Sequence, residues 1–292
     1  MKRAYILLHL AVLLAGFTGI FGKLIDLNQL VLVFYRTLIA SAALGIILAF
    51  SKKKHRYALK DILHIGGTGL VITLHWIFFY GSIKYSNVSI GVVCFCLTGF
   101  FTSLLSPLFR KGSFDKYELM LSLLVLLGIV LIFSFDTTYR FGIFLGIISA
   151  LFASLFTLLN ERLISQYDVW HINFYQLATG AVFTGIMVAI YKKIDVSLVV
   201  IPTPTEWLYL LILGLFCTVL LYTLILMAQR YVSAFTVNLS FNLEPIYSIL
   251  LAILLFQENR VLQPTFYIGC GLVIVSVSIQ MWRLRQLKIK KE

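Results

Sequence analysis

The sequence predicts an all-α integral membrane protein with ten transmembrane helices, arranged as two inverted five-helix repeats with both termini in the cytoplasm. Of the 292 residues, 60% are hydrophobic and only 12% are charged. Soluble domains have roughly 45–50% apolar and about 25% charged residues. The mean hydropathy is +0.96. Nearly all charges lie in short clusters between apolar runs that are long enough to span a bilayer.

Apolar runs of spanning length define the ten helices. We place them at 4–22, 30–50, 62–81, 87–109, 117–135, 141–160, 171–191, 206–227, 232–256 and 264–282. The first run follows Met-Lys-Arg as a signal peptide would, but it lacks a small-x-small cleavage site before Lys23. We therefore expect it to be retained as a helix. Small residues recur every four positions along the sixth run, which predicts close helix packing there.

The distribution of basic residues predicts the orientation, because cytoplasmic loops of membrane proteins are enriched in Lys and Arg. With the N-terminus inside, the cytoplasmic residues are Lys2, Arg3, Lys52, Lys53, Lys54, Arg56, Lys60, Arg110, Lys111, Lys116, Arg162, Arg230, Arg283, Arg285, Lys288, Lys290 and Lys291. The other side receives Lys23, Lys84, Arg140, Lys192, Lys193 and Arg260. The net charge of +12 therefore reflects topology, and we expect no nucleic-acid partner.

An internal repeat divides the chain into residues 1–137 and 138–283, followed by a basic cytoplasmic tail at 284–292. Three matches recur in the same order in both halves: Phe17-Thr18 with Phe156-Thr157, Phe34-Tyr35 with Phe174-Tyr175, and Phe95 and Leu97 with Phe241 and Leu243. Each half contains five predicted spans, an odd number, so the halves enter the membrane from opposite sides. Such inverted repeats are typical of carriers in which a central site alternates between two faces.

Glu244 lies near the middle of the ninth span and directly precedes Pro245. A carboxylate at bilayer depth is costly and usually faces a protein interior or a water-filled cavity. Proline disfavours helical geometry in the preceding residue, so we expect a helix break there. This pattern is typical of transport sites; the alternative is a structural Glu, protonated or paired between helices. In the first half, Thr98 occupies the aligned position, and Pro107 predicts a second break.

Two further ionisable residues lie within predicted spans. Arg36 in the second span either extends to the external surface or faces a central cavity, where it would pair with Glu244 or an anionic substrate group. His75 in the third span follows a flexible Gly66-Gly67-Thr-Gly69 segment. It either relays protons, because its pKa is near neutrality, or is a packing residue.

Polar and aromatic residues in the same spans complete the candidate site. Asn238 and Asn242 are costly in lipid, so we expect them to face inward. Aromatic residues on several spans form either a wall for the substrate or ordinary core packing. The residues that we expect along the substrate or ion pathway are Glu244, Asn238, Asn242, Tyr247, Arg36, His75, Trp76, Tyr80 and Thr98, with Tyr222 as a further aromatic candidate.

Three stretches resemble a known family. They are Asn242-Leu-Glu-Pro245 with the apolar 246–256 and Gln257-Glu258, Phe34-Tyr-Arg-Thr37, and Ser82-Ile-Lys-Tyr-Ser-Asn-Val-Ser89. The chain resembles the EamA-type carriers of the drug/metabolite transporter superfamily. The resemblance implies ten spans in two repeats and a secondary transporter, often an exporter of amino acids, related metabolites or drugs. The resemblance has one departure. Such proteins often carry an acidic residue in the first half, where this chain has Ser106-Pro107 and then Arg110-Lys111, so a mechanism that needs one acid in each half is not expected.

Taken with the residues, the resemblance predicts a carrier of the cell inner membrane that exports a small metabolite by alternating access. The sequence has no phosphate-binding glycine loop, nucleophile elbow or His-Glu-x-x-His pair. We therefore expect no catalytic residue, metal or cofactor, and a gradient of protons, sodium or substrate as the driving force. The alternatives are an integral-membrane enzyme acting on a lipid-like substrate and a membrane sensor that transports nothing.

Overall fold

The structure is a computed structural model that describes residues 2–51, 55, 57–109, 116–134, 139–260, 262 and 264–289. Every regular element within these residues is helical. The first half contains α1 (Lys2–Leu24), α2 (Gln29–Phe50), α3 (Leu59–Tyr85), α4 (Val88–Phe95), α5 (Leu97–Phe109) and α6 (Lys116–Ser134). The second half contains α7 (Arg140–Leu163), α8 (Val169–Ile194), α9 (Pro204–Gly214), the π-helix η1 (Leu215–Leu220), α10 (Leu221–Gln229), α11 (Ala234–Phe241), α12 (Glu244–Phe256), the 3-10 helix η2 (Glu258–Arg260) and α13 (Pro264–Ile289).

These helices occupy the ten predicted ranges. Counting an interrupted helix as one, eight segments are long and apolar enough to cross a membrane. The helices α6 and α13 contain shorter apolar stretches, Leu119–Gly128 and Pro264–Ser276. The protein is thus an all-helical, multi-pass membrane protein, and the crossing of α6 and α13 stays a prediction. The predicted boundary between the halves, at 137–138, and the end of the predicted tail, 290–292, lie outside the described residues.

Three of the ten predicted spans are interrupted. The fourth is interrupted at Cys96, between α4 and α5, and the eighth contains the wider turns of η1. The ninth is interrupted at Asn242 and Leu243, directly before Glu244, where Pro245 predicts it. Pro245 is accommodated in the first turn of α12, a position that needs no amide hydrogen bond. The break that we predicted at Pro107 is absent, because α5 continues through this residue to Phe109.

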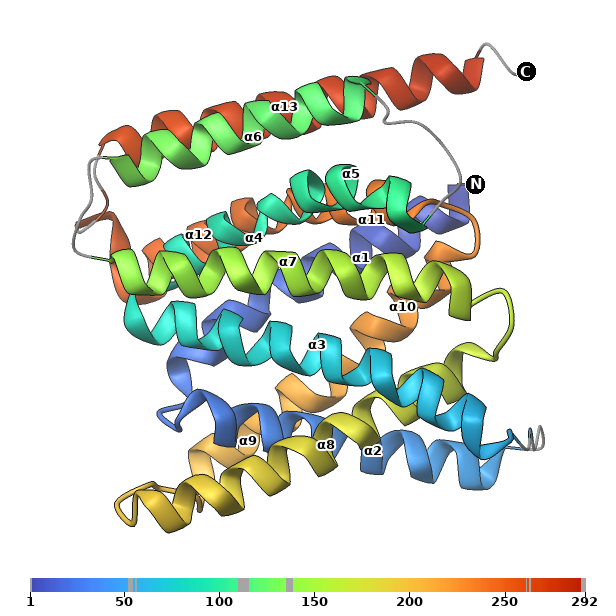
Figure 1. The fold of residues 1–292 in the computed structure, drawn as a ribbon. Helices are drawn as coiled ribbons and strands as arrows, with labels where there is room; N and C mark the ends of the chain where they lie inside the picture. Colours follow the sequence, from blue (N-terminus) through green and yellow to red (C-terminus); the bar gives the residue numbers. More distant parts are fainter. Residues whose placement is uncertain are drawn as a thin grey trace.

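The interrupted helices lie inside the bundle, whereas α6 and α13 pair along one edge of it (Figure 1). α4–α5 and α11–α12 lie next to α1 and α7, and they also contact each other. On the far side of α7, α3 packs against α7 and α8, and α2 packs against α8. The helices α1 and α12 end on the left of Figure 1, whereas α5 and α7 end on the right.

Glycines let α7 lie close to its neighbours, as the spacing of small residues predicts. A Cβ atom added at Gly146 would lie 2.6 Å from the Cβ of Cys94 on α4. One added at Gly142 would lie 2.8 Å from the Cβ of Ser86, at the end of α3. Both distances are shorter than side chains adopt, so α7 needs glycine at these positions to hold α3 and α4 together.

Two carboxylates fix the starts of the interrupted helices. Glu258, after α12, accepts hydrogen bonds from the backbone N–H groups of Val88 and Ser89 at 3.1 and 3.0 Å, and from the Ser89 hydroxyl at 2.6 Å. Glu161, near the end of α7, accepts one from the Ala234 N–H at the start of α11. A carboxylate is favourable at a helix N-terminus, where N–H groups lack partners. The starts of α4 and α11 are thereby tied to helical elements of the second half.

Candidate functional site

Glu244 lies in a small cavity inside the bundle. It is the first residue of α12, and its side chain is only 3% exposed. It lines a cavity of about 30 Å³ that α1, α2, α3, α4, α10 and α11 enclose with it. One water molecule needs roughly 10–15 Å³ measured in this way. The cavity therefore has room for about two waters but not for a metabolite, and the carboxylate is buried in this conformation.

Arg36 of α2 lines the same cavity, with a side chain that is 1% exposed. Its Nε donates to Thr218 Oγ1 at 2.7 Å, its Nη1 to the Tyr80 hydroxyl at 2.6 Å, and its Nη2 to the Cys217 carbonyl at 2.8 Å. The guanidinium carbon lies 4.1 Å from the centre of the Trp76 ring, which adds a cation–π contact. Of the two interpretations of Arg36, the structure shows the buried one.

Thr218 and Cys217 belong to η1, so the π-helix supplies two of the three acceptors for Arg36. The Thr218 hydroxyl itself donates to the Leu213 carbonyl at 2.8 Å, one turn earlier. π-Helical turns within α-helices are frequent at functional sites. Here the irregular turn positions a buried cation.

Glu244 shares this cavity with Arg36 without pairing with it. Both residues are described, and no ion pair within 4.0 Å joins them. In the described part of the chain, no hydrogen bond to the Glu244 side chain is present either. A buried carboxylate without partners is costly, so this group is available to a proton or to a cationic group of a ligand.

Three aromatic residues form the wall between Glu244 and the rest of the bundle. The Nδ1 atom of His75 lies 2.9 Å from the Ser149 hydroxyl and 3.0 Å from the Ser149 carbonyl. Trp76 donates from Nε1 to the Tyr222 hydroxyl at 3.1 Å. His75 is thus both a cavity residue and a hydrogen-bonded packing residue, so both interpretations of it remain.

Asn238 lines a second cavity of about 30 Å³, which shares His75 and Tyr222 with the first. The Asn238 side chain donates to Thr102 Oγ1 at 2.7 Å and accepts from Thr157 Oγ1 at 3.0 Å. The two cavities follow each other inside the bundle, so polar groups extend beyond Glu244.

Phe95 and Phe241 also line both cavities and separate one from the other. They are the last residues of α4 and α11, where the two interruptions begin. Their ring centres are 6.2 Å apart in an edge-to-face arrangement. Aligned positions of the two halves thus meet at the centre of the site.

Four predicted pathway residues, Tyr247, Thr98, Asn242 and Tyr80, do not line either cavity. Tyr247 is half-buried, and its hydroxyl lies 3.5 Å from His9 Nε2 on α1. Thr98 is fully buried, and its hydroxyl has no partner among the described residues. Asn242 lines a separate pocket on the other side of α12. Tyr80 contributes indirectly, through its hydrogen bond with Arg36.

The sequence analysis assigned no role to several residues that the structure brings to the site. Thr18 lines the first cavity and Thr157 the second. These threonines align in the repeat, as do Phe95 and Phe241, so the repeat itself was the signal that could have identified them. Ser149 and Thr218 act as partners of His75 and Arg36, and no sequence pattern indicates them.

The chain matches the EamA-like transporter family twice, over residues 2–134 and over residues 140–282. A curated relative from Bacillus subtilis, named "Uncharacterized transporter YxxF", is 21% identical over 97% of this chain and 90% of its own length. An "Uncharacterized transporter" of Archaeoglobus fulgidus is 23% identical over 98% of this chain and 99% of its own.

A solved structure titled "Crystal structure of protein" has the same fold. It superposes with a TM-score of 0.70, at 18% sequence identity, and the match covers 95% of this chain and 96% of the other. At this identity the likeness concerns the fold alone. The family match, in contrast, extends over nearly the whole length of the sequence in two successive units. The chain therefore belongs to the EamA-like transporter family.

Proposed function

We propose that this protein is a secondary transporter of the cell inner membrane, and that it exports a small metabolite such as an amino acid by alternating access. The observation that carries the proposal is the small buried cavity that the unpartnered Glu244 carboxylate shares with Arg36. Membership of a transporter family supports it, and so do relatives named as transporters.

The two charges of the cavity suit a substrate with opposite charges. Glu244 can accept a proton or pair with an ammonium group, because no protein group occupies its oxygens. Arg36 keeps its charge next to the cavity although several of its N–H groups are used, so it attracts a carboxylate. An amino acid carries both groups. With Thr98 at the aligned position, Glu244 acts as a single coupling carboxylate, for a proton or for sodium.

Contacts at the two ends of the bundle support alternating access. We call the first the α1–α12 clasp: Lys23 Nζ lies 2.9 Å from Glu258 Oε1 and 4.5 Å from the centre of the Phe256 ring. The second is the α5–α7 clasp, in which Arg162 donates from Nη2 to the Phe109 carbonyl at 2.6 Å and lies 5.4 Å from that ring. Each clasp joins one half of the chain to the other.

The two clasps lie at opposite ends of the helices, because α1 and α12 end on one side of Figure 1 and α5 and α7 on the other. Lys23 and Arg162 align in the predicted repeat, and Phe256 and Phe109 each end the second part of an interrupted helix. This arrangement supports an inverted repeat. In the predicted orientation, with both termini in the cytoplasm, the α1–α12 clasp is external and the α5–α7 clasp is cytoplasmic.

The test begins with the substrate. A metabolite screen of cells that lack or overexpress the protein identifies compounds whose export changes, and these are then measured with purified protein in proteoliposomes. We expect Glu244→Gln, which removes the charge at nearly constant shape, to abolish or uncouple transport. Asp195→Asn is the matched control, because it removes a carboxylate from the exposed loop after α8.

Size-exclusion chromatography of the Glu244→Gln protein verifies that it is folded. Full coupled transport by this folded variant would refute the role of Glu244. An unchanged metabolite profile in both strains would instead favour a sensor over a transporter.

A further inference from the structure

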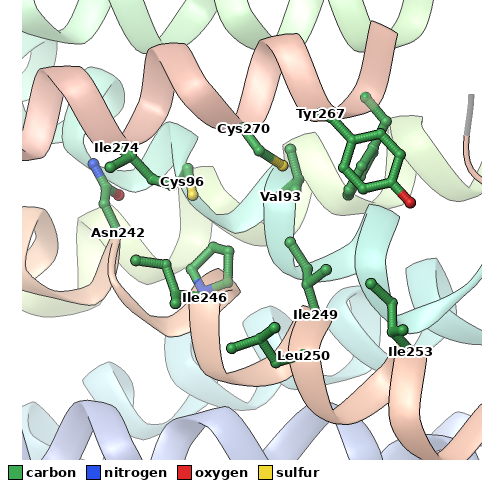
Figure 2. Close-up of a pocket in the computed structure, with 12 residues that line it drawn as sticks. Val93, Cys96, Asn242, Ile246, Ile249, Leu250, Ile253, Tyr267, Cys270 and Ile274 are labelled. Atoms are coloured by element: carbon green, nitrogen blue, oxygen red, sulfur yellow. The ribbon is translucent and has the colours of Figure 1, made fainter. Parts of the chain in front are cut away.

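A larger pocket lies beside the same helix interruption, on the side of α12 that faces α13. Its volume is about 220 Å³, and its walls are almost entirely apolar. Ile246, Ile249 and Ile253 of α12 form one wall, and Tyr267, Cys270 and Ile274 of α13 form the other (Figure 2). Leu250 and Tyr267 at its edge are 56% and 46% exposed. Exposed apolar side chains of a membrane helix face lipid, so the pocket opens toward the bilayer.

Asn242 is the polar residue at one end of this pocket. Its side chain is 1% exposed, and neither its Nδ2 nor its Oδ1 atom has a hydrogen-bond partner among the described residues. In Figure 2 the carboxamide lies beside Cys96 and Ile274, at the end of the pocket away from Tyr267. A buried carboxamide with one free donor group and one free acceptor is unusual and costly.

Both the donor and the acceptor remain unused because of the surroundings. Pro245, which also lines the pocket, has no N–H to offer. Gly99 of α5 has no side chain to offer, and a Cβ atom added there would lie 3.8 Å from Asn242 Nδ2. Neighbouring side chains in the pocket wall are aliphatic, aromatic or thiol groups, which satisfy an amide poorly.

We propose that this pocket is a binding site for a bilayer-soluble, mostly apolar molecule that carries one primary amide or hydroxyl group, which pairs with Asn242. The paired group both donates and accepts, as the two free atoms of the carboxamide require. A cavity of about 150 Å³ lined by apolar side chains binds benzene. A pocket of about 220 Å³ therefore takes a ligand somewhat larger than benzene. The site is distinct from the Glu244 cavity, and its occupancy does not depend on the proposed transport.

Photolabelling of the full-length protein in lipid nanodiscs tests this assignment. The label is 4-azidobenzamide, and mass spectrometry locates the modified residues. We expect them on the pocket faces of α12 and α13. Unlabelled benzamide and toluene then compete for the site, and the ratio of the two half-maximal concentrations is compared between the wild type and Asn242→Leu. This comparison cancels the different partition of the two compounds into the bilayer.

We expect the ratio to shift by about tenfold toward toluene in Asn242→Leu, which is the preference that two hydrogen bonds provide. Because Asn242 makes no side-chain hydrogen bond, this variant is expected to fold. Ile253→Trp fills the pocket and should abolish the labelling, whereas Leu254→Trp is the matched control, since Leu254 is 77% exposed and is not part of the pocket wall.

Equal ratios in the wild type and Asn242→Leu would overturn the proposal and leave a crevice for lipid acyl chains. Labelling that persists in Ile253→Trp, or that lies outside α12 and α13, would overturn it as well.

Discussion

Arg36 is held by three acceptors of different kinds and by the ring of Trp76, all inside the bundle. A planar guanidinium matches this fixed set, whereas a lysine ammonium cannot reach three diverging acceptors from one point. The site therefore requires the shape of the guanidinium at this position as well as its charge.

We accordingly expect Arg36→Lys to lower the stability by about 1–3 kcal/mol, because it leaves buried acceptors without donors. Thermal unfolding in detergent, followed by the fluorescence of a thiol-reactive dye, measures the change. Arg260→Lys is the control, since Arg260 is exposed in η2. Equal melting temperatures for Arg36→Lys and the wild type would mean that the three hydrogen bonds of Arg36 are not required for stability.

At the scale of single residues, Glu244 was recognisable because it is an isolated acid in a long apolar run. Arg36 was visible for the same reason, but its position near a span end left two interpretations, and only packing decides between them. The Cys217 carbonyl, an acceptor of Arg36, could not be predicted, because a backbone group has no signature of its own in the sequence. Asn242 is buried, but it lines the pocket between α12 and α13 and not the Glu244 cavity. A helix break changes which residues share a face.

The interrupted helices show how far single elements can be predicted. Pro245 marks an interruption because it lies at mid-span and directly after an acid. The interruption at Cys96 has no proline or glycine next to it, and η1 contains neither, although Gly214 directly precedes it. There the helix geometry follows from tertiary contacts, such as the bond from Arg36 to Thr218. Local propensity does not contain this information.

Helix α3, with Gly66, Gly67 and Gly69, is a second case in which the sequence did not predict the helix geometry. We expected a flexible segment, but α3 is continuous from Leu59 to Tyr85. A Cβ atom at Gly69 would lie 2.3 Å from the backbone oxygen of Gln176 on α8, whereas nothing lies within 4 Å of one at Gly67. Gly69 thus serves close packing of α3 on α8.

Gly69→Ala should therefore destabilise the protein, by about 1–3 kcal/mol, because two backbones must move apart. Gly67→Ala, two positions earlier in the same helix, should be neutral or stabilising by up to about 1 kcal/mol, because alanine favours the helix. Thermal unfolding of the two purified variants provides the comparison. Similar losses in both variants would contradict the packing role of Gly69.

At the scale of the whole molecule, the all-helical, multi-pass fold followed from composition and apolar run length, which are properties of the entire chain. The orientation, the crossing of α6 and α13 and the inverted repeat depend on the bilayer as well as on the chain, and they stay predictions. The conformation could not be predicted at all. Glu244 is buried in this structure, and the contacts of both clasps are formed.

The two clasps predict opposite effects on access to the site. Opening one end should require only the clasp at that end to break, so Lys23→Met should favour access from the external side and Arg162→Met access from the cytoplasmic side. The reporter is Thr18→Cys, beside Glu244, with the four native cysteines replaced by alanine. A membrane-impermeant maleimide is applied to vesicles of each orientation, and the labelling rate is measured.

The side chain of Lys23 is 37% exposed, whereas that of Glu258 is 2% exposed. With a contribution of about 1 kcal/mol for an ion pair or cation–π contact that is open to solvent on one side, each variant should raise labelling from its own side by about fivefold. Lys193→Met is the matched control, because Lys193 is an exposed lysine at the end of α8 that belongs to neither clasp. Faster labelling from the same side in both variants would contradict the inverted arrangement, because two equivalent contacts at opposite ends cannot open the same face. Unchanged rates in both would mean that the clasps do not control access.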